Sequence, residues 1–311
     1  MLLHPQIQLA LKAMADAKLP AIESLAPADA RAVFDAMAKA RGGTPAPIAG
    51  AEDRGVPGPG GAVPVRIYRP DAAGTRPAVL YFHGGGHVLG NLDTHDVVAR
   101  NLCGGSQAVV VSVDYRMGPE HRFPAAVEDA WAAYRWLLGA APALGVDPAR
   151  LAVCGDSAGG NLAAVLALQA RDAGETAIKL QALVYPVVDY GLAGDSYRRY
   201  AEGYGVLTRG AMQWFQRHYL RSAADAGDWR ASPARAASHA GLPPAVIVNA
   251  ECDVLRDEGA GYAETLRAAG VAVDHREFPG MIHGFFGMTP AIDDAVAAQR
   301  YVADALRRAL A

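Results

Sequence analysis

The stretch Leu151-Ala-Val-Cys-Gly-Asp-Ser-Ala-Gly-Gly-Asn161 decides the fold of this chain. It starts as an apolar run of strand length, turns tightly around Ser157 and enters a helical run that reaches Arg171. Gly155 and Gly159 flank the serine in a Gly-X-Ser-X-Gly pattern. This strand–turn–helix context is what a nucleophile elbow requires, with the serine hydroxyl held above the sheet edge by a strained turn. The plainer alternative is a serine that only caps the helix.

Apolar runs of similar length recur on both sides of this stretch. Because they are nearly continuous, they predict strands buried on both faces, as in a parallel sheet under helices. Helical stretches separate them, so the chain predicts an α/β fold with a mostly parallel central sheet flanked by helices. Strands are expected at 63–68, Ala78–Phe82, Ala108–Val113, Leu151–Cys154, Leu180–Val184, Ala245–Asn249 and 272–277, and helices at 94–103, 124–139, 158–173, 257–269 and 290–310.

Three segments stand outside this alternation. Residues 1–40 are helical in pattern, and residues 42–62 are rich in Gly and Pro and are expected to form a loop. Residues 189–232 make a connection longer than usual and rich in Tyr, Trp and Phe, which favours a lid or binding segment over a plain helical insertion. We expect cap helices in 1–50, a cap insertion in 189–232, and one catalytic core made of 51–188 and 233–311.

Composition narrows the class of protein. With 311 residues, 51% hydrophobic and 20% charged, the chain can bury a large core. A net charge of −3 gives no basic field for nucleic acid or anionic lipid, and no apolar run reaches bilayer length. The first residues read as an amphipathic helix rather than a signal peptide. Three scattered cysteines suggest neither a disulfide framework nor a metal site, so we expect a cytoplasmic protein.

A serine hydroxyl needs a base to become a nucleophile. In folds built on such an elbow, the chain order is serine, acid, histidine, so the base should follow Ser157. The histidines that follow are His218, His239, His275 and His283. We favour His283, because it follows the last predicted strand, and ligand chemistry gathers at the carboxyl ends of such strands.

The acid should follow the preceding strand, which ends in Asn249-Ala-Glu-Cys-Asp253. Asp257 and Glu258 fall where a helix should begin, and the helix dipole accounts for them there. Glu251 suits a structural hydrogen-bond acceptor. We favour Asp253, which would fix the tautomer of His283.

His83-Gly-Gly-Gly86 follows the strand Ala78–Phe82. Adjacent glycines let backbone N–H groups turn inward toward a developing oxyanion. We expect Gly84 and Gly85 to donate, with Ala158 as the third donor. A phosphate loop is disfavoured, since the run lacks both the Walker ending and GxGxxG phasing, and His83 with His87 in a glycine loop is a poor zinc pair.

Together these motifs resemble the hormone-sensitive-lipase-like esterases, the bacterial family IV of carboxylesterases. The motifs that agree in order are HGGG at His83–Gly86, the stretch Asp114–Ala126, GDSAGGN at Gly155–Asn161, and the neighbourhoods of Asp253 and His283. The GDSAG form is similar to that of the larger branch of the family. Met117-Gly118 replaces a pair that is often Leu-Ala in the family.

The resemblance implies an α/β-hydrolase fold with a helical cap, and hydrolysis of short- to medium-chain acyl esters. It implies a catalytic triad of Ser157, Asp253 and His283, an oxyanion hole of Gly84, Gly85 and Ala158, and neither metal nor organic cofactor. The implied partner is a small ester, with a homodimer as a further implication and neither nucleic acid nor a membrane span. An amidase or peptidase on the same scaffold, or a non-catalytic small-molecule receptor, is the alternative function.

The pocket should be lined by the cap. His87 stands after the glycines where a bulky aromatic residue is common in the family, so it is expected beside the oxyanion hole. Packing in the core explains the apolar cap residues equally well. The expected substrate-binding residues are His87, Val206, Leu207, Met212, Trp214 and Phe215.

Overall fold

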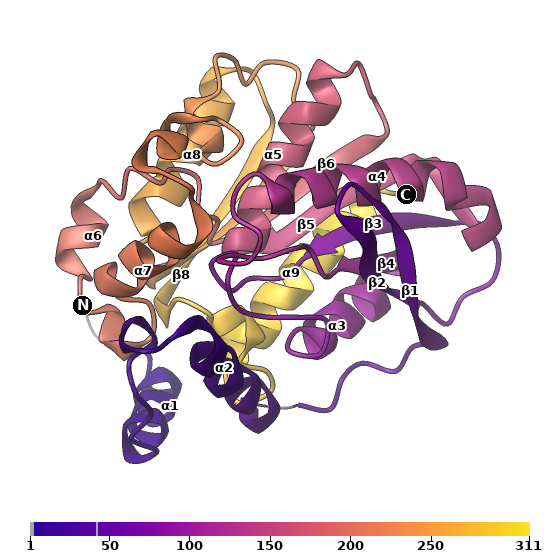
Figure 1. Ribbon diagram of the computed structural model, residues 1–311. Coiled ribbons are helices and arrows are strands. Elements are labelled where there is room, and N and C mark those ends of the chain that lie inside the picture. The colour runs from indigo at the N-terminus through magenta and orange to yellow at the C-terminus, as the bar shows by residue number, and fades with distance from the viewer. Residues whose placement is uncertain (1–2, 42) are drawn as a thin grey trace.

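The computed structural model describes residues 3–41 and 43–311. In this part of the chain a single sheet of eight strands crosses the molecule between two layers of helices (Figure 1). The strands are β1 (Gly50–Gly58), β2 (Gly61–Arg69), β3 (Arg76–Phe82), β4 (Val109–Val113), β5 (Val146–Asp156), β6 (Ile178–Val184), β7 (Ala245–Cys252) and β8 (Val273–Ile282).

The order of the strands is β1-β2-β4-β3-β5-β6-β7-β8. All neighbours from β4 to β8 pair in parallel, whereas β2 is antiparallel to both β1 and β4. The predicted α/β fold with a mostly parallel sheet is therefore confirmed. The connections after β3 and β5 leave toward opposite edges of the sheet, which makes the carboxyl ends of these two strands a topological switch point.

The core helices lie on both faces of the sheet, with α4, α5 and α8 on one side and α3 and α9 on the other (Figure 1). Within the described ranges, none of the helices combines the length and hydropathy of a bilayer-spanning segment. The helices are α3 (Asp96–Ser106), α4 (Ala125–Leu144), α5 (Ala158–Asp172), α8 (Arg256–Ala268) and α9 (Asp293–Ala309).

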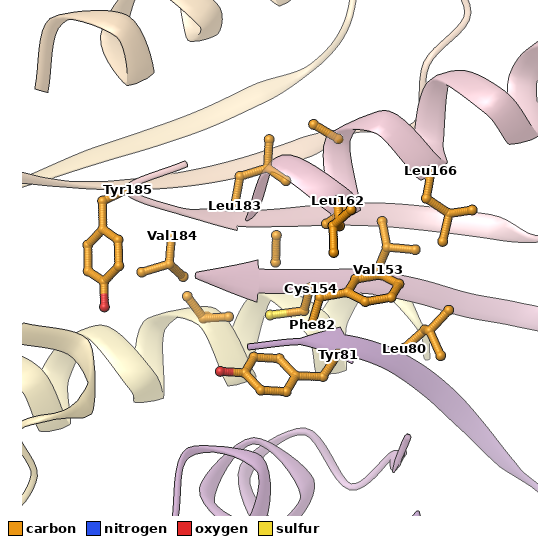
Figure 2. Close-up of a cluster of buried hydrophobic side chains, with 14 of the residues drawn as sticks. Leu80, Tyr81, Phe82, Val153, Cys154, Leu162, Leu166, Leu183, Val184 and Tyr185 are labelled. Carbon is orange, nitrogen blue, oxygen red and sulfur yellow. The ribbon is translucent and has the colours of Figure 1, made fainter. Parts of the chain in front are cut away.

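The core is deepest around β3, β5 and β6. Figure 2 shows Phe82, Val153 and Leu183 of these strands beside Leu162 and Leu166 of α5, all of them buried. Burying apolar surface of this kind is worth about 25 cal/mol per Å². The core therefore fixes the strand ends from which the site residues project.

Two segments distant in sequence lie side by side beyond the carboxyl ends of the strands. The N-terminal segment holds α1 (Pro5–Asp16), the 3₁₀ helix η1 (Ile22–Ser24) and α2 (Pro27–Arg41). The insertion between β6 and β7 holds α6 (Asp195–Arg199), η2 (Gly203–Gly205), α7 (Arg209–Tyr219) and η3 (Ala223–Gly227). Trp214 Nε1 donates to Leu25 O at 3.1 Å and Thr208 Oγ1 donates to Glu23 Oε1 at 2.6 Å, which joins the two segments.

The prediction of a loop over 42–62 is wrong at Gly50–Gly58, which forms β1. This strand pairs with β2 at the edge of the sheet, and Val56 is its one buried side chain. Backbone pairing with β2 holds this edge strand in place, and burial of its side chains contributes little. Its sequence therefore lacks the apolar alternation that normally indicates a strand.

Candidate active site

The two glycine motifs meet at the switch point of the sheet. Phe82, the last residue of β3, pairs in register with Gly155 near the end of β5. The His83–Gly86 loop and the turn at Ser157 therefore leave adjacent strands at the same edge. Parallel strands make this meeting obligatory, because their carboxyl ends share one edge.

Ser157 occupies a strained backbone conformation, with φ 56° and ψ −116°. Non-glycine residues rarely adopt positive φ, and such outliers gather at functional sites. The turn is also too tight for larger neighbours. A Cβ on Gly159 would lie 1.9 Å from Phe82 O, and one on Gly155 would lie 2.3 Å from Gly159 C. The geometry is that of the predicted nucleophile elbow.

Ser157, His283 and Asp253 form a continuous hydrogen-bonded chain. His283 Nδ1 lies 2.7 Å from Asp253 Oδ2, and His283 Nε2 lies 3.0 Å from Ser157 Oγ. Because the carboxylate accepts a hydrogen bond from Nδ1–H, Nε2 is left to accept the hydroxyl proton of the serine. Asp253 is buried, and its other oxygen accepts from Leu255 N at 3.0 Å.

The other candidate bases lie elsewhere. His218 is on α7 against the ring of Trp214, and His275 is within β8. His239 Nε2 lies 2.9 Å from Pro233 O. Among the acids, Glu251 Oε2 accepts from Gly280 N at 2.7 Å, so it holds the chain that leads to His283.

Glu258 lies in the first turn of α8, as predicted, and its half-buried carboxyl group faces residues beside the site. Its carboxyl accepts from Val188 N at 2.9 Å and from Tyr197 OH at 3.1 Å. Burial raises the pKa of Glu258 to about 8, because these two hydrogen bonds offset only part of the desolvation and the charges of Asp189 and Asp253 oppose ionisation.

The His83–Gly86 loop, predicted to form the oxyanion hole, differs from the prediction at one residue. The N–H of Gly84 already donates to Asp156 Oδ1 at 3.2 Å, so it is not available to a substrate oxygen. Within the described residues, the N–H groups of Gly85 and Gly86 are donated to no other group. The N–H of Ala158 opens α5, where first-turn N–H groups have no partner inside the helix. The available donors are thus Gly85, Gly86 and Ala158.

A cavity of about 450 Å³ opens above Ser157 between the N-terminal segment and the insertion. Of the expected substrate-binding residues, Val206, Leu207, Met212 and Phe215 line it. The sequence did not single out the lining residues that come from the N-terminal segment and from the sheet edge. These include Leu11, Met14, Leu19, Phe34, Met37, His95, Asp156 and Tyr185.

Two expected pocket residues face away from this cavity. His87 is buried beneath the oxyanion loop, where its ring stacks on Tyr219 at 3.9 Å and its Nδ1 lies 2.8 Å from Tyr190 OH. Burial, with a smaller effect of His83, lowers the pKa of His87 to about 3. Trp214 is two positions from Met212, about 200° around the helix, so it points toward Leu25 instead.

Metal chemistry gains no support from the side chains. In the part of the chain that the structure describes, no three His, Cys, Asp or Glu residues are grouped so that they could hold a metal ion.

The chain is similar in sequence and fold to proteins of known class. Residues 79–287 match a family described as having the alpha/beta hydrolase fold. The chain is 45% identical to carboxylesterase NlhH of Mycobacterium tuberculosis over 80% of its own length and 79% of that protein. It is 43% identical to ethyl acetate hydrolase of Pseudomonas putida, over 81% of this chain and 80% of the relative.

Among solved structures, a hyperthermophilic esterase from Pyrobaculum calidifontis superposes with a TM-score of 0.95 at 42% identity, covering all of both chains. The chain belongs to the α/β-hydrolase family. The resemblance to the hormone-sensitive-lipase-like carboxylesterases is confirmed at that level.

Proposed function

We propose that this carboxylesterase hydrolyses esters of short- to medium-chain acids through an acyl-enzyme on Ser157. The observation that carries the proposal is the hydrogen-bonded chain Ser157–His283–Asp253 at the base of a largely apolar cavity. The relatives named as carboxylesterases support the reaction class.

Acylation follows from this arrangement. Ser157 Oγ attacks the carbonyl carbon of the ester while its proton passes to His283 Nε2, 3.0 Å away. The resulting imidazolium is stabilised by Asp253 on its other nitrogen. The carbonyl oxygen becomes an oxyanion, and the N–H groups of Gly85, Gly86 and Ala158 donate to it.

The intermediate then collapses. The bond to the alcohol oxygen breaks, and the alcohol takes the proton from His283 Nε2 and leaves. Water attacks the acyl-enzyme after giving a proton to the same nitrogen, and the acid is released as Ser157 regains its hydrogen.

The pocket supports neutral, mostly apolar substrates. Leu207, Met212 and Phe215 from the insertion face Phe34 and Met37 from the N-terminal segment across the cavity. We propose that the two segments together form the cap. Membership of the GDSAG branch, the cytoplasmic location and the homodimer stay predictions.

The test is covalent labelling combined with turnover. The wild-type protein should hydrolyse p-nitrophenyl butyrate with a burst of p-nitrophenol, and a fluorophosphonate probe should label Ser157. Ser157→Ala should remove both signals and keep the native circular dichroism spectrum, because the small residue fits the same turn.

A matched panel of esters and amides with the same acyl group separates the alternatives. Faster turnover of the amides would indicate an amidase or peptidase. A wild-type protein that binds esters but neither turns them over nor reacts with the probe would be a receptor, and would refute the proposal.

A further inference from the structure

Asp156, the residue before the nucleophile, is a buried carboxylate that the mechanism above does not use. Its Oδ1 accepts from Tyr81 OH at 2.6 Å and from Gly84 N at 3.2 Å. Its Oδ2 lies 3.5 Å from His95 Nε2, and both side chains of this pair are about nine-tenths buried. One carboxylate therefore joins the end of β3, the elbow and the loop before α3.

The contact with the oxyanion loop is steric as well as polar. A Cβ on Gly84 would lie 2.4 Å from Asp156 Oδ2 and 3.1 Å from Asp156 O. The carboxylate thus packs directly on the backbone that leads into Gly85 and Gly86. Any displacement of Asp156 would move the two N–H donors that follow.

His95 is the partner of the second oxygen of Asp156. Burial would raise the pKa of Asp156, but the charge and hydrogen bond of His95, helped by Tyr81, outweigh it and lower the pKa. The His95 ring lies between Phe34 of α2 at 6.4 Å and His83 at 5.4 Å, measured between ring centroids. It is held in the cavity wall by aromatic neighbours from both the cap and the core.

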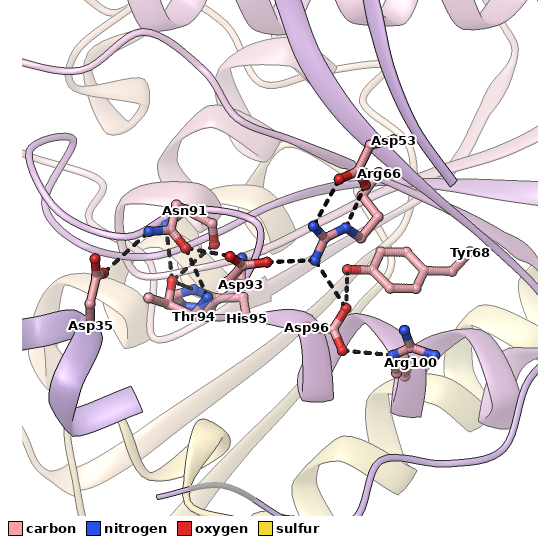
Figure 3. Close-up of polar contacts among 10 residues, drawn as sticks. All are labelled: Asp35, Asp53, Arg66, Tyr68, Asn91, Asp93, Thr94, His95, Asp96 and Arg100. Atoms are coloured by element: carbon pink, nitrogen blue, oxygen red, sulfur yellow. Dashed lines mark hydrogen bonds and ion pairs between the residues drawn. The ribbon is translucent and has the colours of Figure 1, made fainter. Parts of the chain in front are cut away.

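The loop that carries His95 is tied on two further sides, as Figure 3 shows. Thr94 Oγ1 lies 2.9 Å from His95 Nδ1, and Asn91 Nδ2 donates to Asp35 Oδ1 of α2 at 3.2 Å. Arg66 of β2 bonds Asp93 at 2.8 Å. The position of His95 is therefore set by α2 and by the sheet together.

Resting on the proposed esterase function, we propose that His95 and Asp156 form a positioning pair that orients the Gly84–Gly86 loop for oxyanion stabilisation. Neither side chain transfers a proton to the substrate in this role. The pair acts through the backbone N–H donors, which stabilise the oxyanion of the transition state. Loss of the pair should therefore reduce kcat and leave KM nearly unchanged.

The experiment is a double-mutant cycle with His95→Phe, Asp156→Asn and the variant that carries both. His95→Phe keeps a ring between Phe34 and His83 but removes the partner of Asp156. Misplacing oxyanion donors costs about tenfold to a hundredfold in rate, so each single variant should lose kcat on that scale with KM within about twofold. The double variant should be no slower than the slower single variant, because His95 acts only through Asp156.

A second readout separates positioning from general stability. A trifluoromethyl ketone, whose adduct on Ser157 carries an oxyanion, should bind the variants more weakly in proportion to their loss of kcat. Affinity for the product acid should not change. Asp53→Asn, which loosens the exposed end of the same network at Arg66, is the matched control and should keep the wild-type kcat.

Unchanged kcat in folded single variants, additive losses in the double variant, or a rise in KM alone would overturn the proposal. If Asp156→Asn does not fold, Tyr81→Phe removes one donor from Asp156 and takes its place in the cycle. Failure of the esterase function is distinguishable, because the wild-type protein itself would then show neither turnover nor fluorophosphonate labelling.

Discussion

Ser157 has a positive φ, and its hydroxyl group lies within hydrogen-bonding distance of His283 Nε2. The strained backbone therefore occurs at the residue whose hydroxyl group meets the histidine. The N–H of Ser157 donates to Val184 O at 2.8 Å, and its carbonyl oxygen accepts from Asn161 N and Val187 N. Backbone hydrogen bonds from β6, the loop after it and α5 therefore hold a conformation that an isolated serine would leave.

Glu258 allows a prediction about stability and pH. Its pKa is about 8 in the native state, against a usual 4.5, so the native protein keeps a proton that the unfolded chain loses. Stability contributed by this proton is complete below about pH 4.5, falls as the pH rises toward 8 and then levels off, with a slope of at most about 1.4 kcal/mol per pH unit.

Glu258→Gln cannot ionise, so its stability should change less with pH between 5 and 8 than that of the wild-type protein. Urea unfolding of both proteins at each pH unit measures the difference. Parallel stability curves for the two proteins would show that Glu258 does not hold the extra proton.

At the residue scale, chain order and strand ends predict Ser157, Asp253 and His283 as a set, and the structure places their side chains in hydrogen-bonding contact. The same reasoning assigns an oxyanion role to Gly84, but the N–H of this residue donates to the carboxylate of Asp156 at the end of β5. A contact between β3 and β5 depends on register and side-chain rotamer, and neither is encoded in a local motif.

At the scale of elements, α7 shows which predictions depend on helix phase. Met212 and Phe215 lie on the face toward the cavity, whereas Trp214 faces η1. An apolar and aromatic helix sequence indicates burial but not which buried face meets substrate. The edge strand β1 gives no such apolar signal, since most of its side chains are not buried, and the sequence therefore does not predict it.

Phe215→Ala should shift the preference of the enzyme toward longer esters. The ring packs on Gly86, where a Cβ would lie 2.1 Å from Phe215 Cδ1, so its removal opens space beside the oxyanion loop. Rates with p-nitrophenyl esters of increasing acyl length and with alkyl butyrates of increasing alcohol length measure the shift. The ratio of long to short substrate should rise about tenfold in at least one series.

Trp214→Phe on the same helix is the control for this shift. Its Nε1 donates to Leu25 O, just after η1, and its ring does not line the cavity, so both ratios should match those of the wild-type protein. Equal shifts in the two variants would mean that general loosening of α7, rather than the cavity wall, sets the preference.

At the scale of the whole molecule, the three cysteines report on global unfolding. Cys103, Cys154 and Cys252 are free and buried, and burial raises the pKa of each thiol. Thiolate is the reactive form, so native protein should react slowly with Ellman's reagent and unfolded protein should release three equivalents.

Reducing agent and EDTA should both leave the esterase activity unchanged, because the proposed mechanism uses neither a disulfide nor a metal ion.

In the thiol experiment, fast reaction of one thiol in native protein would instead reveal local opening of the sheet near that cysteine.

The cavity wall is assembled from the N-terminal segment and from the insertion between β6 and β7, while Ser157, Asp253 and His283 stay at the strand ends. This division has an evolutionary consequence. Substrate range can diverge among descendants by exchange of peripheral segments, with no rerouting of the sheet. The same arrangement constrains that divergence, since the paired contacts Trp214–Leu25 and Thr208–Glu23 require both segments to change together. Recombination that transfers one segment alone would change only one side of the cavity wall and would break the contacts between the two segments.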